Sequence, residues 1–292
     1  MEPRSRCVPG ADGLPLHVLE WSADGVPMLL LHGFGNEAHV WDDFAPSVAP
    51  YYRVAAVDLR GHGDSGHDPE AGYDYDFHVR DLECVTAALG IERLVLVGHS
   101  LGGRIAMLFA GKHPDRIAGL VLVDSGPELD PRGVLRIRLD AEKALGAGGG
   151  EPAIGSPAEY ERMLSLAYPA ARPEAIARMA HHGLRSRPGG GFERKTDPKF
   201  HDGARRVTPS DAAAREQRVA KELWEALERV ACPTLVVRGA ASDVLAAEVA
   251  DRMVEQALAR GSLASVARAG HSVMIDNPEG FDQAVSAFVL GD

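Results

Sequence analysis

The sequence predicts an α/β protein built on a mostly parallel, doubly wound sheet with one helical insertion. Short apolar segments alternate with helix-like stretches along most of the 292 residues. Five of these segments are apolar almost without interruption, as expected for parallel strands that are covered on both faces. Residues 126–208 interrupt the alternation, because they contain several helix-like pieces and no convincing strand. Together these three observations predict the fold class.

The apolar segments are short enough to be strands, and the amphipathic segments between them are long enough to be helices. Strands are expected at residues 14–21, 27–32, 52–57, 93–98, 117–123, 233–238 and 262–267. The five from 27–32 through 233–238 are the continuously apolar ones. Helices are expected at residues 77–89, 101–112, 245–259 and 278–290. A helix between successive strands favours parallel neighbours.

The interruption is expected to be a helical insertion, or cap, at residues 126–208, within a core made of residues 1–125 and 209–292. Its helix-like pieces are residues 134–145, 157–167 and 173–186. Glycine runs at 146–150 and 188–191 suit either a mobile lid or plain loops.

Composition excludes several functions. The formal net charge of −11 argues against a nucleic-acid partner, because such partners are bound through basic surfaces. Cys7, Cys84 and Cys232 are far apart and show no zinc-ligand or disulfide spacing, so buried reduced thiols are expected. No apolar run has the length of a membrane span, and the first residues lack the apolar centre of a signal peptide. These features predict a cytoplasmic protein without metal or cofactor.

The segment LVLVGHSLGGRIAMLFA, at residues 94–110, carries the strongest chemical signal. Its GxSxG string is common by chance in a chain rich in glycine and serine, and its context is what makes it informative. A predicted strand precedes Ser100 and a predicted helix follows it, as a nucleophile on a sharp strand-to-helix turn requires. Gly98 and Gly102 leave room where strand and helix crowd together. Ser100 is therefore the predicted nucleophile.

A serine nucleophile needs a general base and a carboxylate that orients the base. His271 follows the last predicted strand, so it should lie at the same sheet edge as Ser100. Two aspartates could orient it, since Asp124 follows the strand at 117–123 and Asp243 follows the strand at 233–238. Both satisfy the chain order serine, acid, histidine.

Acyl transfer also requires donors for the oxyanion that forms on the substrate. His32-Gly33-Phe34-Gly35 directly follows a predicted strand, so backbone amides there should face Ser100. The expected pair of donors is the amide of Phe34 and the amide of Leu101, with His32 in a structural role.

Several motifs occur together in a familiar order: HGF at 32–34, DLRGHGDS at 58–65, GHSLGG at 98–103, GAASD at 239–243 and GHS at 270–272. Through them the sequence resembles the α/β-hydrolase superfamily along nearly its whole length. The resemblance implies that residues 126–208 are the variable cap and that DLRGHGDS is chiefly a shaped loop. It also favours Asp243 as the acid, because the superfamily usually places the acid after the penultimate core strand. Some relatives place it one strand earlier, which leaves Asp124 as the alternative.

These residues predict a serine hydrolase that cleaves a small-molecule carboxylic ester, lactone or thioester through an acyl-enzyme. The resemblance supports an acyl carbon as the target, because relatives that cleave haloalkanes or epoxides carry an aspartate in place of Ser100. The alternatives are carbon–carbon bond hydrolysis, or perhydrolase or lyase chemistry, on the same residues, and a ligand receptor that turns over poorly. Apolar side chains of the insertion either line the pocket or pack the insertion onto the core: Met163, Leu164, Tyr168, Met179 and Phe192.

Overall fold

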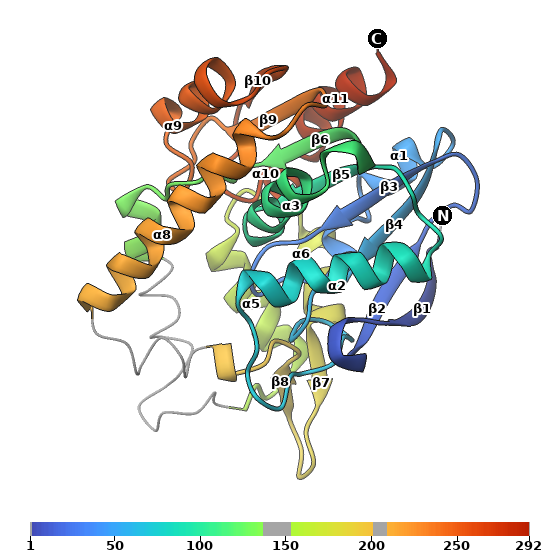
Figure 1. Ribbon diagram of the computed structural model, residues 1–292. Helices are drawn as coiled ribbons and strands as arrows, with labels where there is room; N and C mark the ends of the chain where they lie inside the picture. Colours follow the sequence, from blue (N-terminus) through green and yellow to red (C-terminus); the bar gives the residue numbers. More distant parts are fainter. Residues whose placement is uncertain (1, 137–152, 201–208, 292) are drawn as a thin grey trace.

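The computed structural model describes residues 2–136, 153–200 and 209–291 (Figure 1). Within them one sheet of eight strands has the order β1-β2-β4-β3-β5-β6-β9-β10. The first pairings, β1 with β2 and β2 with β4, are antiparallel, and all the others in this sheet are parallel. The strands are β1 (Arg4–Pro9), β2 (Pro15–Glu20), β3 (Val26–Leu31), β4 (Tyr52–Val57), β5 (Leu94–His99), β6 (Ile117–Val123), β9 (Thr234–Gly239) and β10 (Gly261–Val266). The predicted mostly parallel α/β sheet is confirmed.

Strand β1 was not predicted from the sequence. It lies at the edge of the sheet, and of its residues RSRCVP only Val8 is buried. A solvated edge strand lacks the apolar run that marks the central strands.

The three cysteines are free. Cys232 is buried as expected, but Cys7 is exposed on β1, so the expectation of a buried thiol is wrong for Cys7.

Alternate side chains of the central strands enter two separate cores, which explains their continuous hydrophobicity. In β3, Met28 and Leu30 pack on one face of the sheet, and Leu29 and Leu31 pack on the other. Helices α2 (Tyr75–Ala88), α3 (Leu101–Lys112) and α8 (Pro209–Glu228) cover one face (Figure 1). Helices α1 (Ala45–Val48), α10 (Val273–Asp276) and α11 (Pro278–Leu290) cover the other.

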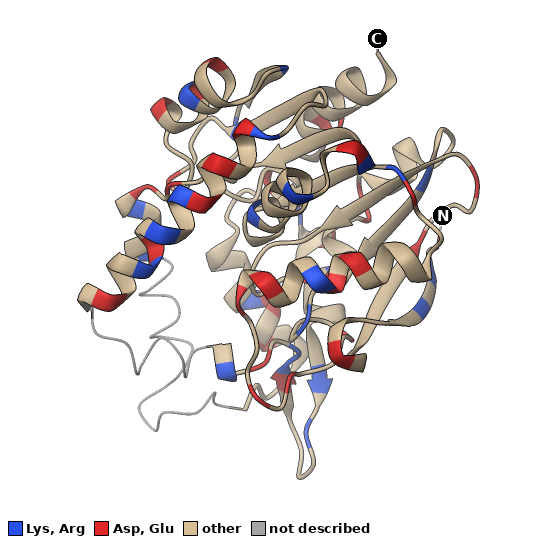
Figure 2. Ribbon diagram, viewed as in Figure 1, with Lys and Arg blue, Asp and Glu red and all other residues tan. Residues whose placement is uncertain are grey.

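The helix boundaries agree with the predictions at α3 and α11 and nearly so at α2. The helix expected at 245–259 is shorter, because α9 (Ala247–Arg252) passes into a π-helical turn, η4 (Met253–Ala257). Short 3₁₀ turns, η1 (Ala11–Gly13), η2 (Ala38–Trp41) and η3 (Pro114–Arg116), complete the core. Helix α8 was not predicted; charged residues are interspersed along it (Figure 2), and its buried side chains pack toward α3.

Between β6 and α8 the structure places α5 (Pro157–Ala167), α6 (Pro173–Gly183) and a small hairpin of β7 (Leu184–Ser186) and β8 (Phe192–Arg194). The helix expected at 173–186 thus ends three residues early, at the first hairpin strand. The hairpin is a difference from the expected strand-free insertion, and Gly189, Gly190 and Gly191 turn its chain with positive φ angles. The predicted helix at 134–145 lies mostly, and the glycine run at 146–150 wholly, outside the described residues.

Helix α6 contacts the core at η2. The His182 ring stacks on the His39 ring with centroids 3.4 Å apart, and Arg178 Nη2 lies 2.6 Å from Asp43 Oδ2. Whether residues 126–208 act as a cap stays a prediction. None of the helices in the described part of the chain is both long and apolar enough to cross a bilayer.

Candidate active site

Ser100 lies on a sharp turn between β5 and α3, as the sequence predicts. Its φ of 51° and ψ of −114° are a strained combination for a residue with a side chain. A Cβ atom on Gly98 would lie 2.4 Å from the carbonyl oxygen of Gly102, and one on Gly102 would lie 2.5 Å from that of Leu31. The two glycines are therefore needed for space, and they let strand and helix meet behind the serine.

Ser100, His271 and Asp124 form one hydrogen-bonded chain. Nε2 of His271 is 2.9 Å from Ser100 Oγ, and Nδ1 is 2.8 Å from Asp124 Oδ2. Because a carboxylate only accepts, Nδ1 carries the hydrogen and Nε2 is left to accept from the serine hydroxyl. The arrangement can take a proton from Ser100 and stabilise the imidazolium that results.

Asp124 is fully buried at the carboxyl end of β6, where its backbone has a φ of 44°. The Gly239 amide donates to Oδ1 at 3.0 Å, and the Ser242 hydroxyl donates to Oδ2 at 2.5 Å. These two donors come from the end of the neighbouring strand β9 and the loop that follows it, so they hold the carboxylate toward His271. These bonds satisfy the acceptor oxygens of a carboxylate that has no access to solvent.

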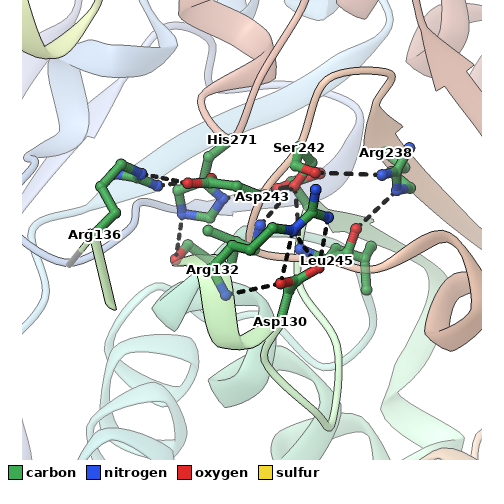
Figure 3. Close-up of polar contacts among 11 residues, drawn as sticks. Asp130, Arg132, Arg136, Arg238, Ser242, Asp243, Leu245 and His271 are labelled. Carbon is green, nitrogen blue, oxygen red and sulfur yellow. Dashed lines mark hydrogen bonds and ion pairs between the residues drawn. The ribbon is translucent and has the colours of Figure 1, made fainter. Parts of the chain in front are cut away.

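The preference for Asp243 as the partner of His271 is corrected by this geometry. Asp243 accepts instead from Arg136, with Nε to Oδ2 at 2.6 Å and Nη2 to Oδ1 at 3.0 Å (Figure 3). Its hydrogen bonds with Arg136 are the main reason that its pKa is lowered. The residue that binds Nδ1 of His271 is Asp124, which the sequence left as the alternative.

Backbone contacts tie the loop after β3 to the Ser100 turn. The Gly102 amide donates to the His32 carbonyl at 3.2 Å, and a Cβ on Gly33 would lie 3.1 Å from that of Ser100. Leu101 is the first residue of α3, so its amide has no acceptor within the helix. Phe34 follows Gly33 in the same loop, and the pair of oxyanion donors, the amides of Phe34 and Leu101, stays a prediction.

His32 has the structural role that was expected. Its Nε2 accepts from the Leu59 amide at 2.9 Å, and its Nδ1 lies 2.8 Å from the Gly33 carbonyl. Burial lowers its pKa, so it is a neutral ring that shapes the loop.

His99 is a supporting residue that sequence reasoning missed. Its buried ring donates from Nε2 to the carbonyl oxygen of His271 at 2.9 Å, and burial holds its pKa well below its usual range. Ser125 supports Ser100 in a similar way, because its hydroxyl donates to the Ser100 carbonyl at 2.7 Å. Each is the sequence neighbour of a residue in the hydrogen-bonded chain of Ser100, His271 and Asp124, and that adjacency is the one signal that could have drawn attention to them.

The chain is similar to known proteins of one family. A family profile described as alpha/beta hydrolase fold matches residues 26–141. A 3-hydroxybutyrate-oligomer hydrolase of Cupriavidus necator is 32% identical over 272 residues, covering 89% of this chain and 87% of that protein. The chain belongs to the α/β-hydrolase family.

Solved structures of this family superpose on nearly the whole chain. An α/β-hydrolase from Novosphingobium aromaticivorans is 30% identical, with a TM-score of 0.79 over 98% of this chain and 97% of that one. An E-2-(acetamidomethylene)succinate hydrolase is 27% identical, with a TM-score of 0.78 over 98% and 99%. Other relatives share only a segment. An uncharacterized protein of Mycobacterium tuberculosis aligns at 37% identity over 105 residues, which is 36% of this chain and 30% of that protein.

Asp58 and Asp64 of the DLRGHGDS loop form, with His17 of β2, the one cluster in the described residues that could hold a metal ion by proximity. The Asp58 carboxylate, however, accepts from the Ala38 amide at 2.6 Å, the Asp64 amide at 2.8 Å and His17 Nδ1 at 2.8 Å. These bonds give the carboxylate a structural task, in agreement with the expectation of a shaped loop.

Tyr168, one of the five insertion residues singled out from the sequence, reaches the site. Its hydroxyl donates to Asn36 Oδ1 at 3.3 Å, and the backbone N–H of Asn36 donates to the Gly33 carbonyl. Leu164 and Met179 are buried in the core, Tyr168 and Phe192 pack against it, and Met163 is 45% exposed. The packing interpretation thus fits four of the five side chains, and Tyr168 also borders the loop of the predicted oxyanion donors.

Proposed function

We propose that the protein is a serine hydrolase of carboxylic esters that works through an acyl-enzyme. The observation that supports this most strongly is the hydrogen-bonded chain from Ser100 Oγ through His271 to the buried Asp124. A serine with an imidazole nitrogen 2.9 Å from its Oγ, and with the second ring nitrogen bound to a carboxylate, has what nucleophilic attack on an acyl carbon needs.

In this proposal His271 takes the proton as Ser100 Oγ attacks the carbonyl carbon. The amides of Phe34 and Leu101 stabilise the tetrahedral oxyanion. His271 then gives its proton to the leaving alcohol, whose bond to the acyl carbon breaks. Water, activated by the same ring, releases the acid and restores Ser100. Asp124 remains charged throughout and stabilises the imidazolium.

One relative that covers most of the chain supports an ester in preference to other acyl compounds. It is named as a hydrolase of 3-hydroxybutyrate oligomers, and oligomers of a hydroxy acid are joined by ester bonds. The match covers 89% of this chain and 87% of that protein, so it is not confined to one segment.

The test is a panel of p-nitrophenyl esters of increasing acyl length, together with lactones, thioesters and vinylogous diketones. Wild-type protein should release p-nitrophenol with a burst, and Ser100→Ala should lower kcat by roughly 10⁴-fold or more, since removal of a nucleophile leaves only binding and oxyanion stabilisation. Turnover confined to the diketones would favour carbon–carbon bond hydrolysis. Saturable binding of every ester without turnover would favour a receptor and overturn the proposal.

A further inference from the structure

Asp276 lies beside the candidate site, and the proposed reaction does not use its side chain. It is the last residue of α10, and its carboxylate turns back toward the loop that precedes this helix. There Oδ2 accepts from the Gly270 amide at 2.8 Å. Gly270 directly precedes His271 in the chain. Asp276 therefore holds the backbone next to the ring that is bonded to Ser100.

The position of Asp276 is fixed by its own neighbours. The three residues before it are at most 1% exposed and pack in the core. The Asp276 amide donates to the Ser272 carbonyl at 2.9 Å, which closes the helical turn. Asn277, the next residue, caps α11 by accepting from the Gly280 amide at 3.0 Å. The Asp276 carboxylate therefore projects from a segment that is anchored on both sides.

The backbone of His271 is held by two hydrogen bonds. Asp276 accepts from the amide of the preceding residue, and His99 donates to the His271 carbonyl at 2.9 Å. The loop itself leaves β10, which is the last strand of the sheet in the described part of the chain. Residues 267–270 connect this strand to His271 without being part of it. The two bonds therefore fix the place where the loop carries the ring.

Gly270 also contacts the strand end that supports Asp124. A Cβ atom on Gly239 would lie 1.9 Å from the Gly270 carbonyl oxygen, so the two backbones are in direct contact. The Gly239 amide is one of the donors to Asp124. A shift of Gly270 would change the position of His271 relative to both of its partners, which lie 2.8 and 2.9 Å from its ring nitrogens.

We propose that Asp276 is a positioning residue for His271, acting through the hydrogen bond that its carboxylate accepts from Gly270. This inference rests on the proposed reaction and adds one residue to it. Proton transfer from Ser100 requires donor and acceptor within hydrogen-bonding distance, so a small displacement of the His271 ring lowers the rate. Because Asp276 acts on His271 and not on the substrate, its loss lowers kcat and leaves KM nearly unchanged.

The charge of Asp276 has to be separated from its hydrogen bond. Burial is the main reason that its pKa is raised, and the charges of His271 and Asp124 also act on it, so the carboxyl lies near both. Asp276→Asn removes the charge and keeps an acceptor oxygen for the Gly270 amide, whereas Asp276→Ala removes both. Because the effect belongs to the hydrogen bond, asparagine should retain what alanine loses.

Asn277 offers a matched control on the same segment. Its side chain also binds backbone groups, accepting from the Gly280 amide at 3.0 Å and donating to the Ala267 carbonyl at 2.8 Å. Asn277→Ala removes these two bonds and leaves the bond between Asp276 and Gly270 in place. It should lower the urea midpoint, as the loss of a helix cap does, without lowering kcat.

The experiment measures two rates for each variant that is folded by circular dichroism. One is kcat for p-nitrophenyl butyrate, determined together with KM, and the other is the rate constant for phosphonylation of Ser100 by a fluorophosphonate. We expect Asp276→Ala to lower both rates by about tenfold and to change KM by less than about twofold. Asp276→Asn should stay within about threefold of the wild type, and Asn277→Ala within about twofold.

Wild-type rates in Asp276→Ala would overturn the inference, and so would an equal fall in Asp276→Asn, because it would assign the effect to charge. A fall of the same size in Asn277→Ala would also overturn it, since any loosening of the segment would then slow the reaction. If Asp276→Ala does not fold, Asp276→Glu replaces it. Its longer side chain displaces the acceptor oxygens and should lower both rates by about threefold or more, and wild-type rates there would overturn the inference.

Failure of the proposed function gives a different result. If the wild type hydrolyses no ester but is phosphonylated at Ser100, the ester proposal fails and the phosphonylation rates still test Asp276. If the wild type is not phosphonylated at Ser100 either, the proposed function is contradicted and this inference with it.

Discussion

At the scale of single residues, the choice between two aspartates decides the chemistry of the site. Asp124 and Asp243 both follow core strands, and the sequence alone left them as alternatives with Asp243 preferred. Their side chains differ in partners. Asp124 is buried with donors from Gly239 and Ser242, and Asp243 is partly exposed and held by Arg136.

The two carboxylates can be compared by substitution with asparagine. Asp124→Asn should lower kcat for p-nitrophenyl butyrate by about 10³–10⁴-fold, because an amide can hold the wrong tautomer of His271. Asp243→Asn should lower it by less than about tenfold, since it leaves the His271–Asp124 bond in place. Steady-state kinetics on folded protein, checked by circular dichroism, measures both. A larger fall in kcat for Asp243→Asn than for Asp124→Asn would show that Asp243 is the acid that orients His271.

Sequence reasoning found Ser100, His271 and both candidate acids because each stands next to a predicted strand end. It could not choose between the acids, because the choice depends on where a side chain points. That direction is set by Ser242 and Arg136, which lie 118 and 107 residues from their partners in sequence. Arg136 carries no local pattern that would have drawn attention to it.

At the scale of elements, the turn between β5 and α3 holds Ser100 in a strained conformation that depends on close packing. Gly98 packs against backbone atoms of Gly102 and Gly103, which cannot move aside as a flexible side chain could. The sequence predicted this crowding from the motif, and the two neighbouring elements begin and end within one residue of their expected limits.

Gly98→Ala should therefore destabilise the fold by roughly 1–3 kcal/mol, because the new methyl group would overlap backbone atoms. Gly119→Ala is a matched control in the adjacent strand β6, since its Cβ would lie 3.8 Å or more from the nearest atoms. It should be neutral or slightly stabilising. Urea denaturation measures both, and equal midpoints for the two variants would show that the turn is not tightly packed.

The central strands were predictable, whereas the edge strand β1, the hairpin β7–β8 and helix α8 were not. The central strands are recognisable because both faces are buried, as the split of β3 between two cores shows. The edge strand β1 is mostly solvated, and the strands of the hairpin β7–β8 have only three residues each, so their sequences lack a periodic apolar signal. The π-helical turn at Met253–Ala257 is equally invisible, because its residues continue a helical pattern.

At the scale of the whole molecule, buried histidines should make stability depend on pH. Burial lowers the pKa of His32, His62, His78, His99 and His182, to about 3 for His78 and about 4 for His182. These rings are neutral in the folded protein. At a pH below 6.5, the ordinary pKa of histidine, they gain protons when the protein unfolds. Unfolding thus takes up protons, and stability present above pH 6.5 is lost as the pH falls toward about 4.

Urea midpoints at pH 7.5 and pH 5 measure this effect, and the midpoint at pH 5 should be lower. Two carboxyl groups act against this loss of stability at low pH. Burial raises the pKa of Glu37 and Asp276, so the folded protein binds their protons more tightly and is stabilised at lower pH. The five histidines should outweigh them. His78→Leu should show a smaller loss between the two pH values, because it removes one proton-binding group. An unchanged or higher midpoint at pH 5 would contradict this account.

The central claim for the molecule is that Ser100 is the nucleophile of the proposed reaction. The most direct measurement is mass spectrometry of the intact protein and its peptides after reaction with a fluorophosphonate, which phosphonylates activated serines. The account predicts one added group, located on the peptide that contains Ser100, and none in Ser100→Ala. No addition to the wild type, or addition at another residue with Ser100 unmodified, would contradict it.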